Sequence, residues 1–111
     1  QWIHVDEERA KNELPTQTTI AHGFLSLSLS VPLAAQVWTV TGAKMLINYG
    51  LNKVRFINMV PVNSKVRMSV KVKEVNELDN GGTQVISEET LEIEGQEKPA
   101  YVAELIMVAY K

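Results

Sequence analysis

The clearest periodic pattern lies in the second half of the chain, where apolar and polar residues alternate one by one over residues 65–75. Val66, Met68 and Val70 fall on one side of this alternation, and charged residues such as Arg67 fall on the other. A period of two with one apolar side predicts a β-strand that buries one face and leaves the other in water.

Two turns follow this strand and divide the rest of the chain. The run DNGG at residues 79–82 contains residue types that tolerate left-handed backbone, so it predicts a tight turn. Residues 95–99 contain a Gly and a Pro and predict a second turn. Residues 83–94 are then the returning strand and residues 100–110 a last, apolar strand. Three strands joined by short turns predict an antiparallel meander.

Two further elements are expected nearer the N-terminus. Residues 44–56 are rich in β-forming residues and predict a strand, with a bulge or bend at Gly50. Residues 6–13 predict a short polar helix, because acidic side chains come first and Lys11 comes late, as the helix dipole favours. Pro15 ends this helix.

The stretch between these parts fits two periods. The run LSLSLS at residues 25–30 alternates like a strand, yet Phe24, Leu27 and Val31 recur at helical spacing. Length favours a helix, because residues 20–40 form an apolar segment longer than a typical strand. Such a segment, apolar nearly all round, predicts one long buried helix, kinked at Pro32. A long helix wrapped by a curved antiparallel sheet is a hotdog, so we expect one α+β hotdog domain over residues 1–111.

Composition narrows the classes of function. The chain has 111 residues, a hydrophobic share of 45% and a formal net charge of -2, which does not suggest a nucleic-acid surface. It contains no cysteine, so disulfides and thiolate metal sites are excluded, as expected in a reducing cytoplasm. No apolar run approaches the roughly 20 residues that span a bilayer, so we expect no membrane partner.

Three separated blocks resemble the MaoC-like dehydratases, the hotdog-fold (R)-specific enoyl-CoA hydratases. The blocks are QWIHVDEERAK, TIAHGFLSLSL and INYGLNKVRFINMVPVNSKVR. That family carries an Asp-x-Asn-Pro-(aliphatic)-His motif before a short acidic helix. Ile3 and His4 match the end of this motif, whereas Gln1 and Trp2 stand in place of the usual Asn and Pro. The resemblance puts the Asp of the motif upstream of Gln1.

The resemblance implies a mechanism for hydrating a trans-2-enoyl thioester. One group must take a proton from water and another must deliver a proton to the α-carbon, and the family assigns these tasks to its Asp and His, here His4. The backbone N–H of Gly23 is expected to stabilise the negative charge that develops on the thioester carbonyl. His22 is expected to orient rather than to transfer protons. Without the resemblance, a histidine such as His4 more often has a surface or structural role, and Gly23 also fits a packing role.

The substrate is expected to be an acyl-CoA or an acyl carrier protein thioester, with no cofactor and no metal. Phe24 and Leu27 are candidate acyl-pocket residues as well as core residues. Asn52, Lys53 and Arg55 are candidates for the phosphates of coenzyme A, since arginine suits phosphate geometry. The same three residues also fit the solvated face of a strand.

Two alternative functions remain open, and the sequence also leads to expectations about the oligomeric state and the length of the protein. The alternatives are a hotdog acyl-CoA thioesterase, which would need a carboxylate near the helix that residues 20–40 lack, and a non-catalytic hotdog partner subunit. We expect a homodimer, because hotdog sheets of this family pair edge to edge. We also expect that the natural protein is longer and that the 111 residues alone lack hydratase activity, because the Asp is missing from them.

Overall fold

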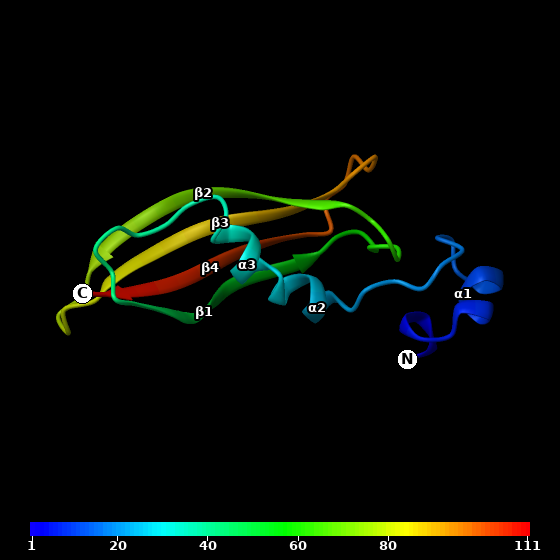
Figure 1. The fold of residues 1–111 in the computed structure, drawn as a ribbon, viewed down its shortest axis with the longest axis horizontal. Helices are drawn as coiled ribbons and strands as arrows, with labels where there is room; N and C mark the ends of the chain where they lie inside the picture. Colours follow the sequence, from blue (N-terminus) through cyan, green and yellow to red (C-terminus); the bar gives the residue numbers. More distant parts are fainter.

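The protein is described by a computed structural model that covers residues 1–111. Four strands form one antiparallel sheet in the order β1-β4-β3-β2, and the helices precede them in the chain (Figure 1). The elements are η1 (Trp2–His4), α1 (Glu7–Glu13), α2 (Gly23–Ser28), α3 (Ser30–Ala34), β1 (Met45–Phe56), β2 (Val66–Glu77), β3 (Thr83–Ile93) and β4 (Tyr101–Tyr110). The predicted meander is therefore confirmed, and none of the helices has the length and apolar character that a bilayer span requires.

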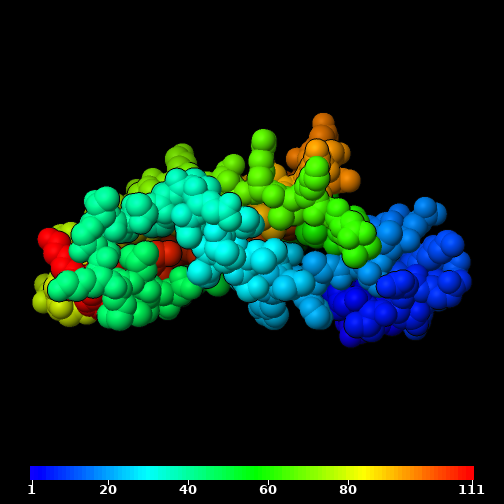
Figure 2. Space-filling view, in the orientation of Figure 1, coloured from blue at the N-terminus to red at the C-terminus, as the bar shows by residue number.

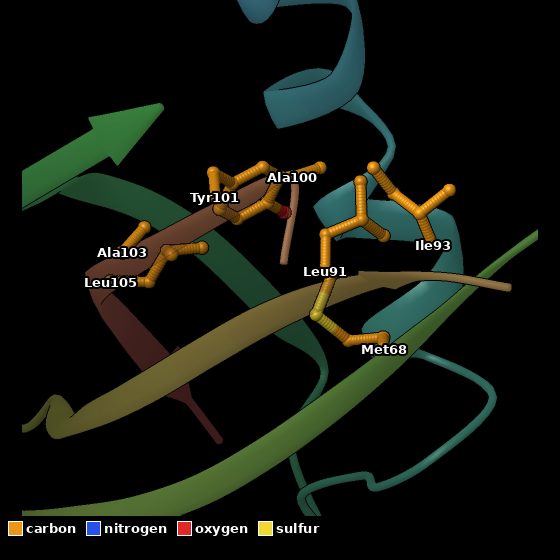
Figure 3. Packing of buried hydrophobic residues seen from close by; sticks show 7 residues of the cluster. All are labelled: Met68, Leu91, Ile93, Ala100, Tyr101, Ala103 and Leu105. Atoms are coloured by element: carbon orange, nitrogen blue, oxygen red, sulfur yellow. The ribbon is translucent and has the colours of Figure 1, made fainter. Parts of the chain in front are cut away.

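Strand alternation determines which side of the sheet carries the core. Odd-numbered residues of β3, from Val85 to Ile93, are buried, whereas their neighbours are only partly buried. The sheet contributes one apolar cluster, which Figure 3 shows: Met68, Leu91, Ile93, Ala100, Tyr101, Ala103 and Leu105. Leu27 and Leu33 pack against this cluster from the helices, so α2 and α3 cover this inner face of the sheet.

The helix differs from the one predicted over residues 20–40. It is two short helices that meet at Leu29 and end at Ala34. Pro32 gives the physical reason, because it cannot donate to the carbonyl of Ser28 and its ring crowds that carbonyl, where α2 ends. The helix is also not buried all round, since the side chain of Phe24 is 79% exposed. The residues that approach the sheet are small, as predicted: Ser26 and Ser30 are buried.

The positions of β1 and β4 in the sheet account for the different burial of their side chains. β4 lies between β1 and β3, which accounts for its apolar residues on both faces. β1 is an edge strand, and almost all of its side chains are exposed. Its pairing with β4 shifts between Asn48 and Gly50, which confirms the predicted bulge, and shifts again between Leu51 and Lys53.

The N-terminal segment lies at one end of the elongated molecule, beyond the sheet (Figures 1 and 2). The Asp6 carboxylate caps α1 by accepting from the Arg9 N–H at 3.0 Å, and the helix stops two residues before Pro15, as predicted. The Arg9 guanidinium also lies 4.1 Å from the centre of a Trp2 ring. These local contacts shape the segment that carries His4.

Candidate active site

His4 is fixed by the strand-like segment that follows α1. Its Nδ1 lies 2.7 Å from the carbonyl oxygen of Ile20, and the Ile20 N–H donates back to the Ile3 carbonyl at 3.0 Å. A carbonyl oxygen only accepts hydrogen bonds, so Nδ1 carries a proton, and Nε2 makes no hydrogen bond within the chain. A histidine held in this way can offer Nε2 to a proton in general acid–base catalysis.

His22 lies directly beside His4, although the sequence separates them by the whole of α1 and its following loop. The two ring centroids are 4.0 Å apart and the ring planes are tilted by 50°. His22 precedes α2 as its N-cap residue, and its carbonyl accepts from the Ser26 N–H at 3.1 Å. The structure therefore brings the two predicted histidines together at the start of the helix.

Gly23, the first residue of α2, opens onto a cleft of about 300 Å³ that His4 also lines. The remaining wall comes from the chain after β1 and from the ring of Phe56. A Cβ atom on Gly23 would lie 3.0 Å from two carbons of that ring. Any larger residue here would have to displace the Phe56 ring. The Gly23 N–H, the first of the helix, makes no hydrogen bond within the chain.

A second hollow, an apolar groove of about 370 Å³, runs between the helices and β1. Phe24, Leu27 and Val31 line it from the helices, and Leu51 lines it from β1. Phe24 stands edge-on to Phe56 with ring centroids 6.2 Å apart, so an aromatic pair lies between the cleft and the groove. The two predicted acyl-pocket residues are thus in one groove beside the cleft.

The three residues suggested for phosphate contact lie elsewhere. Lys53 pairs with Glu104 and Arg55 with Val102, positions that alternate with the inward-facing residues of β4. Asn52 Nδ2 donates to Glu104 Oε1 at 2.7 Å, and this bond lowers the pKa of the Glu104 carboxyl, with help from Lys73. These side chains are exposed on the outer face of the sheet, and the structure does not bring them to the cleft.

Sequence reasoning missed a buried acid beneath the helices. Glu89 is 1% exposed, and burial raises the pKa of its carboxyl to about 7. Neither of its oxygens has a hydrogen-bond partner, and the hydroxyl of Tyr101 has none either. The signal was present in the alternation, because Glu89 shares its phase with Val85 and Leu91, but a glutamate in a strand is usually assigned to the solvent side.

No three His, Cys, Asp or Glu side chains lie close enough together to hold a metal ion. The groups at the cleft are instead His4, whose Nε2 makes no hydrogen bond, His22, whose ring contacts that of His4, and the unpaired backbone N–H of Gly23.

Solved structures share the fold of this protein over the whole chain. One is the X-ray structure of a monoamine oxidase regulatory protein from Archaeoglobus fulgius, with a TM-score of 0.78 and 22% identity, covering 100% of this chain and 73% of that one. Another is a MaoC-like dehydratase from Rhodospirillum rubrum, with a TM-score of 0.75 and 15% identity, covering 100% of this chain and 75% of that one. The likenesses show the α+β hotdog fold.

Sequence comparison identifies the family. The family model described as MaoC like domain matches residues 1–94. The chain is 53% identical to 3-hydroxyacyl-thioester dehydratase Z of Mycobacterium tuberculosis, over 96% of this chain and 70% of that protein. It is 39% identical to nodulation protein N of Rhizobium leguminosarum bv. viciae, over 97% of this chain and 68% of that protein. The chain thus belongs to the MaoC-like dehydratase family, as its three sequence blocks predicted, and it is a hydratase or dehydratase, a hydro-lyase.

Proposed function

We propose that the protein interconverts trans-2-enoyl and (R)-3-hydroxyacyl thioesters by acid–base catalysis at His4. The observation that carries this proposal is the state of His4: its Nδ1 proton is held by the Ile20 carbonyl, while Nε2 is free beside a cleft that Gly23 also lines. A 3-hydroxyacyl thioester is the substrate class named for the mycobacterial relative.

His4 acts in this proposal with the carboxylate that the family resemblance puts upstream of Gln1. Together they take a proton from water and return one to the α-carbon. The Gly23 N–H, which no group of the chain accepts, is available to the thioester carbonyl as negative charge develops on its oxygen. His22, with its ring against His4, restrains the imidazole and so orients it.

The apolar groove is the proposed site of the acyl chain. Its helical wall is Phe24, Leu27 and Val31, and it begins on the far side of the Phe24–Phe56 pair from His4. Apolar walls favour a hydrocarbon chain because its burial removes apolar surface from water. The carrier, coenzyme A or acyl carrier protein, remains outside. The proposal gives Asn52, Lys53 and Arg55 no contact with the coenzyme A phosphates, because these side chains lie on the outer face of the sheet.

A homodimer through β1 completes the proposal. This edge strand leaves one side of its backbone without a neighbouring strand and exposes large apolar side chains, including Met45, Ile47 and Tyr49 at 49%, 41% and 70%. Unpaired edges of this kind are normally covered, and a second copy of the same edge is self-complementary. Sedimentation should give a dimer at micromolar concentration, and a monomer would contradict this part of the proposal.

We also propose a cytoplasmic location, because the chain contains no cysteine, and cell fractionation tests this proposal.

The decisive experiment compares two histidine variants of the full-length protein with crotonyl-CoA as substrate. His4→Ala should lose about 10²–10⁴-fold in hydration rate, the usual contribution of a general acid–base group, with its melting temperature unchanged. His22→Gln, the matched control on the neighbouring ring, should lose less. Near-full activity of His4→Ala would remove His4 from the mechanism, and release of free coenzyme A without hydration would indicate a thioesterase.

A further inference from the structure

A layer of polar side chains lies buried between the helices and the sheet, where an apolar core would be expected. Its members are all at most 5% exposed: Ser26, Ser30, Ser87, Glu89 and Tyr101. Figure 3 shows Tyr101 among the apolar side chains of the core, with its hydroxyl oxygen directed into that group. Buried polar groups cost free energy unless they bond to one another, so a layer of five requires an explanation.

Strand register puts the acid and the phenol side by side. Leu91 pairs with Tyr101, and Glu89 pairs with Ala103, so Glu89 and Tyr101 are diagonal neighbours on the inner face. Burial raises the pKa of the Tyr101 hydroxyl well above its usual value, the Glu89 carboxylate raises it further, and the Ser30 hydroxyl lowers it. Ser30 is thus close to Tyr101 Oη without a geometry that makes a full hydrogen bond.

No charge compensates Glu89 from any element packed against it. β2 places Val70 opposite it, and β4 places Tyr101 and Ala103 there. Residues 23–43, which include both covering helices, contain no ionisable side chain at all. The carboxyl is consequently neutral over the lower part of the physiological range, where it can donate one hydrogen bond and accept others.

The polar layer reaches both hollows of the candidate site. Ser30 lines the apolar groove, and Ser26 lines the cleft with His4 and Gly23. Both serines belong to the helices whose other side chains form the wall of the groove. Whatever fixes these serines on the sheet also fixes the groove.

We propose that Glu89 is a positioning residue: while its carboxyl is uncharged, the buried layer beneath α3 stays free of water, and this packing of α3 on the sheet sets the shape of the groove that binds the acyl chain. This inference rests on the proposed function for its substrate, but not for its structural step. When Glu89 ionises, an unpaired carboxylate beneath the helix must acquire water, which loosens α3. Binding of a long acyl chain should then weaken, while the chemical step at His4 changes less.

The test follows kcat and KM for a four-carbon and an eight-carbon trans-2-enoyl-CoA from pH 6 to 9, with the full-length protein. The wild type should show a rise in KM of about fivefold or more for the longer substrate as the pH passes 7, which is about 1 kcal/mol of binding free energy, with a smaller change in kcat. Glu89→Gln, which stays neutral, should keep the low KM throughout. Glu88→Gln, a neighbouring glutamate on the other face of β3, is the matched control and should titrate like the wild type.

A second readout does not depend on activity. Amide hydrogen exchange, corrected for its intrinsic pH dependence, should show lower protection of residues 23–34 above pH 7 in the wild type and constant protection in Glu89→Gln. Equal profiles of the wild type and Glu89→Gln in both measurements would overturn the inference. If the wild type hydrates neither substrate, the proposed function fails, and the exchange result alone decides the role of Glu89.

Discussion

Replacing Gly23 by alanine perturbs one atom at the centre of the candidate site, and the structure gives the cost. The new Cβ would lie 3.0 Å from Cδ1 and Cε1 of Phe56 and 3.1 Å from its Cγ. Overpacking of this kind typically costs about 1–3 kcal/mol. Alanine also favours a helix over glycine by about 1 kcal/mol, which opposes the clash. The Phe56 ring is 49% exposed, so it can move, and the net loss of stability should be about 0–2 kcal/mol.

A double-mutant cycle with Phe56→Ala separates these contributions. Without the ring, Gly23→Ala should become neutral or stabilising, so the coupling between the two positions should be about 1 kcal/mol or more. Urea denaturation followed by circular dichroism measures all four proteins. Gly50→Ala is the matched control, because a Cβ there meets nothing within 4 Å. A cost of Gly23→Ala that is the same with and without the ring would refute the close approach.

The same substitution should also lower the activity of the protein. Displacement of the ring moves a wall of the cleft next to the N–H that is proposed to receive the thioester oxygen. Alanine keeps the backbone N–H, so the donor itself is retained and any loss of activity comes from the displaced wall. The Gly23→Ala protein should therefore remain folded and lose hydration rate with crotonyl-CoA, and full activity would show that the Phe56 wall does not position the thioester.

Three further substitutions have expected outcomes that denaturation measures. Burial raises the pKa of Glu89 from 4.5 to about 7, so the stability contributed by its neutral form should be fully present below pH 4.5 and be lost as the pH rises to 7, by about 3 kcal/mol relative to Glu89→Gln; parallel curves of the two proteins would contradict this. Gly82→Ala places a Cβ 2.8 Å from Val108 Cγ1 in the core of the sheet and should cost about 1–3 kcal/mol, so a neutral result would refute the contact. Asp6→Ala removes the cap that accepts from the Arg9 N–H and should cost about 1 kcal/mol, which Asp6→Asn should largely restore.

The sheet was predictable because its signals are local. Alternation over residues 65–75 identified β2, and Gly81 and Gly95, both with positive φ, mark the turns on either side of β3. The pairing of β1 with β4, in contrast, follows from no local pattern. No place in the sheet was predicted for β1, because the hotdog fold was inferred only from the long apolar segment and the strands that follow it.

The helix was overestimated for a physical reason. A segment apolar all round normally signals burial within one chain, but Phe24, Leu25 and Val31 are exposed here, so the same pattern describes a surface that the 111 residues do not cover. Of the predicted site residues, His4 and Gly23 line one cleft. The contact of His4 with His22 depends on the hydrogen bonds of Ile20, which no spacing rule anticipates.

The way in which the His4 segment is attached divides the site between two parts of unequal stability. Of residues 1–22, only Ala10 and Ile20 are buried, and the backbone bonds Ala21 N–H to Val60 O and Val62 N–H to Thr19 O join this end to the chain after β1. Segments with so little buried surface open at a free energy well below that of global unfolding. Gly23 and the groove belong to the stable part, and His4 belongs to the other. On mild heating, activity should therefore be lost while the sheet is still intact, because the segment of residues 1–22 that carries His4 opens first.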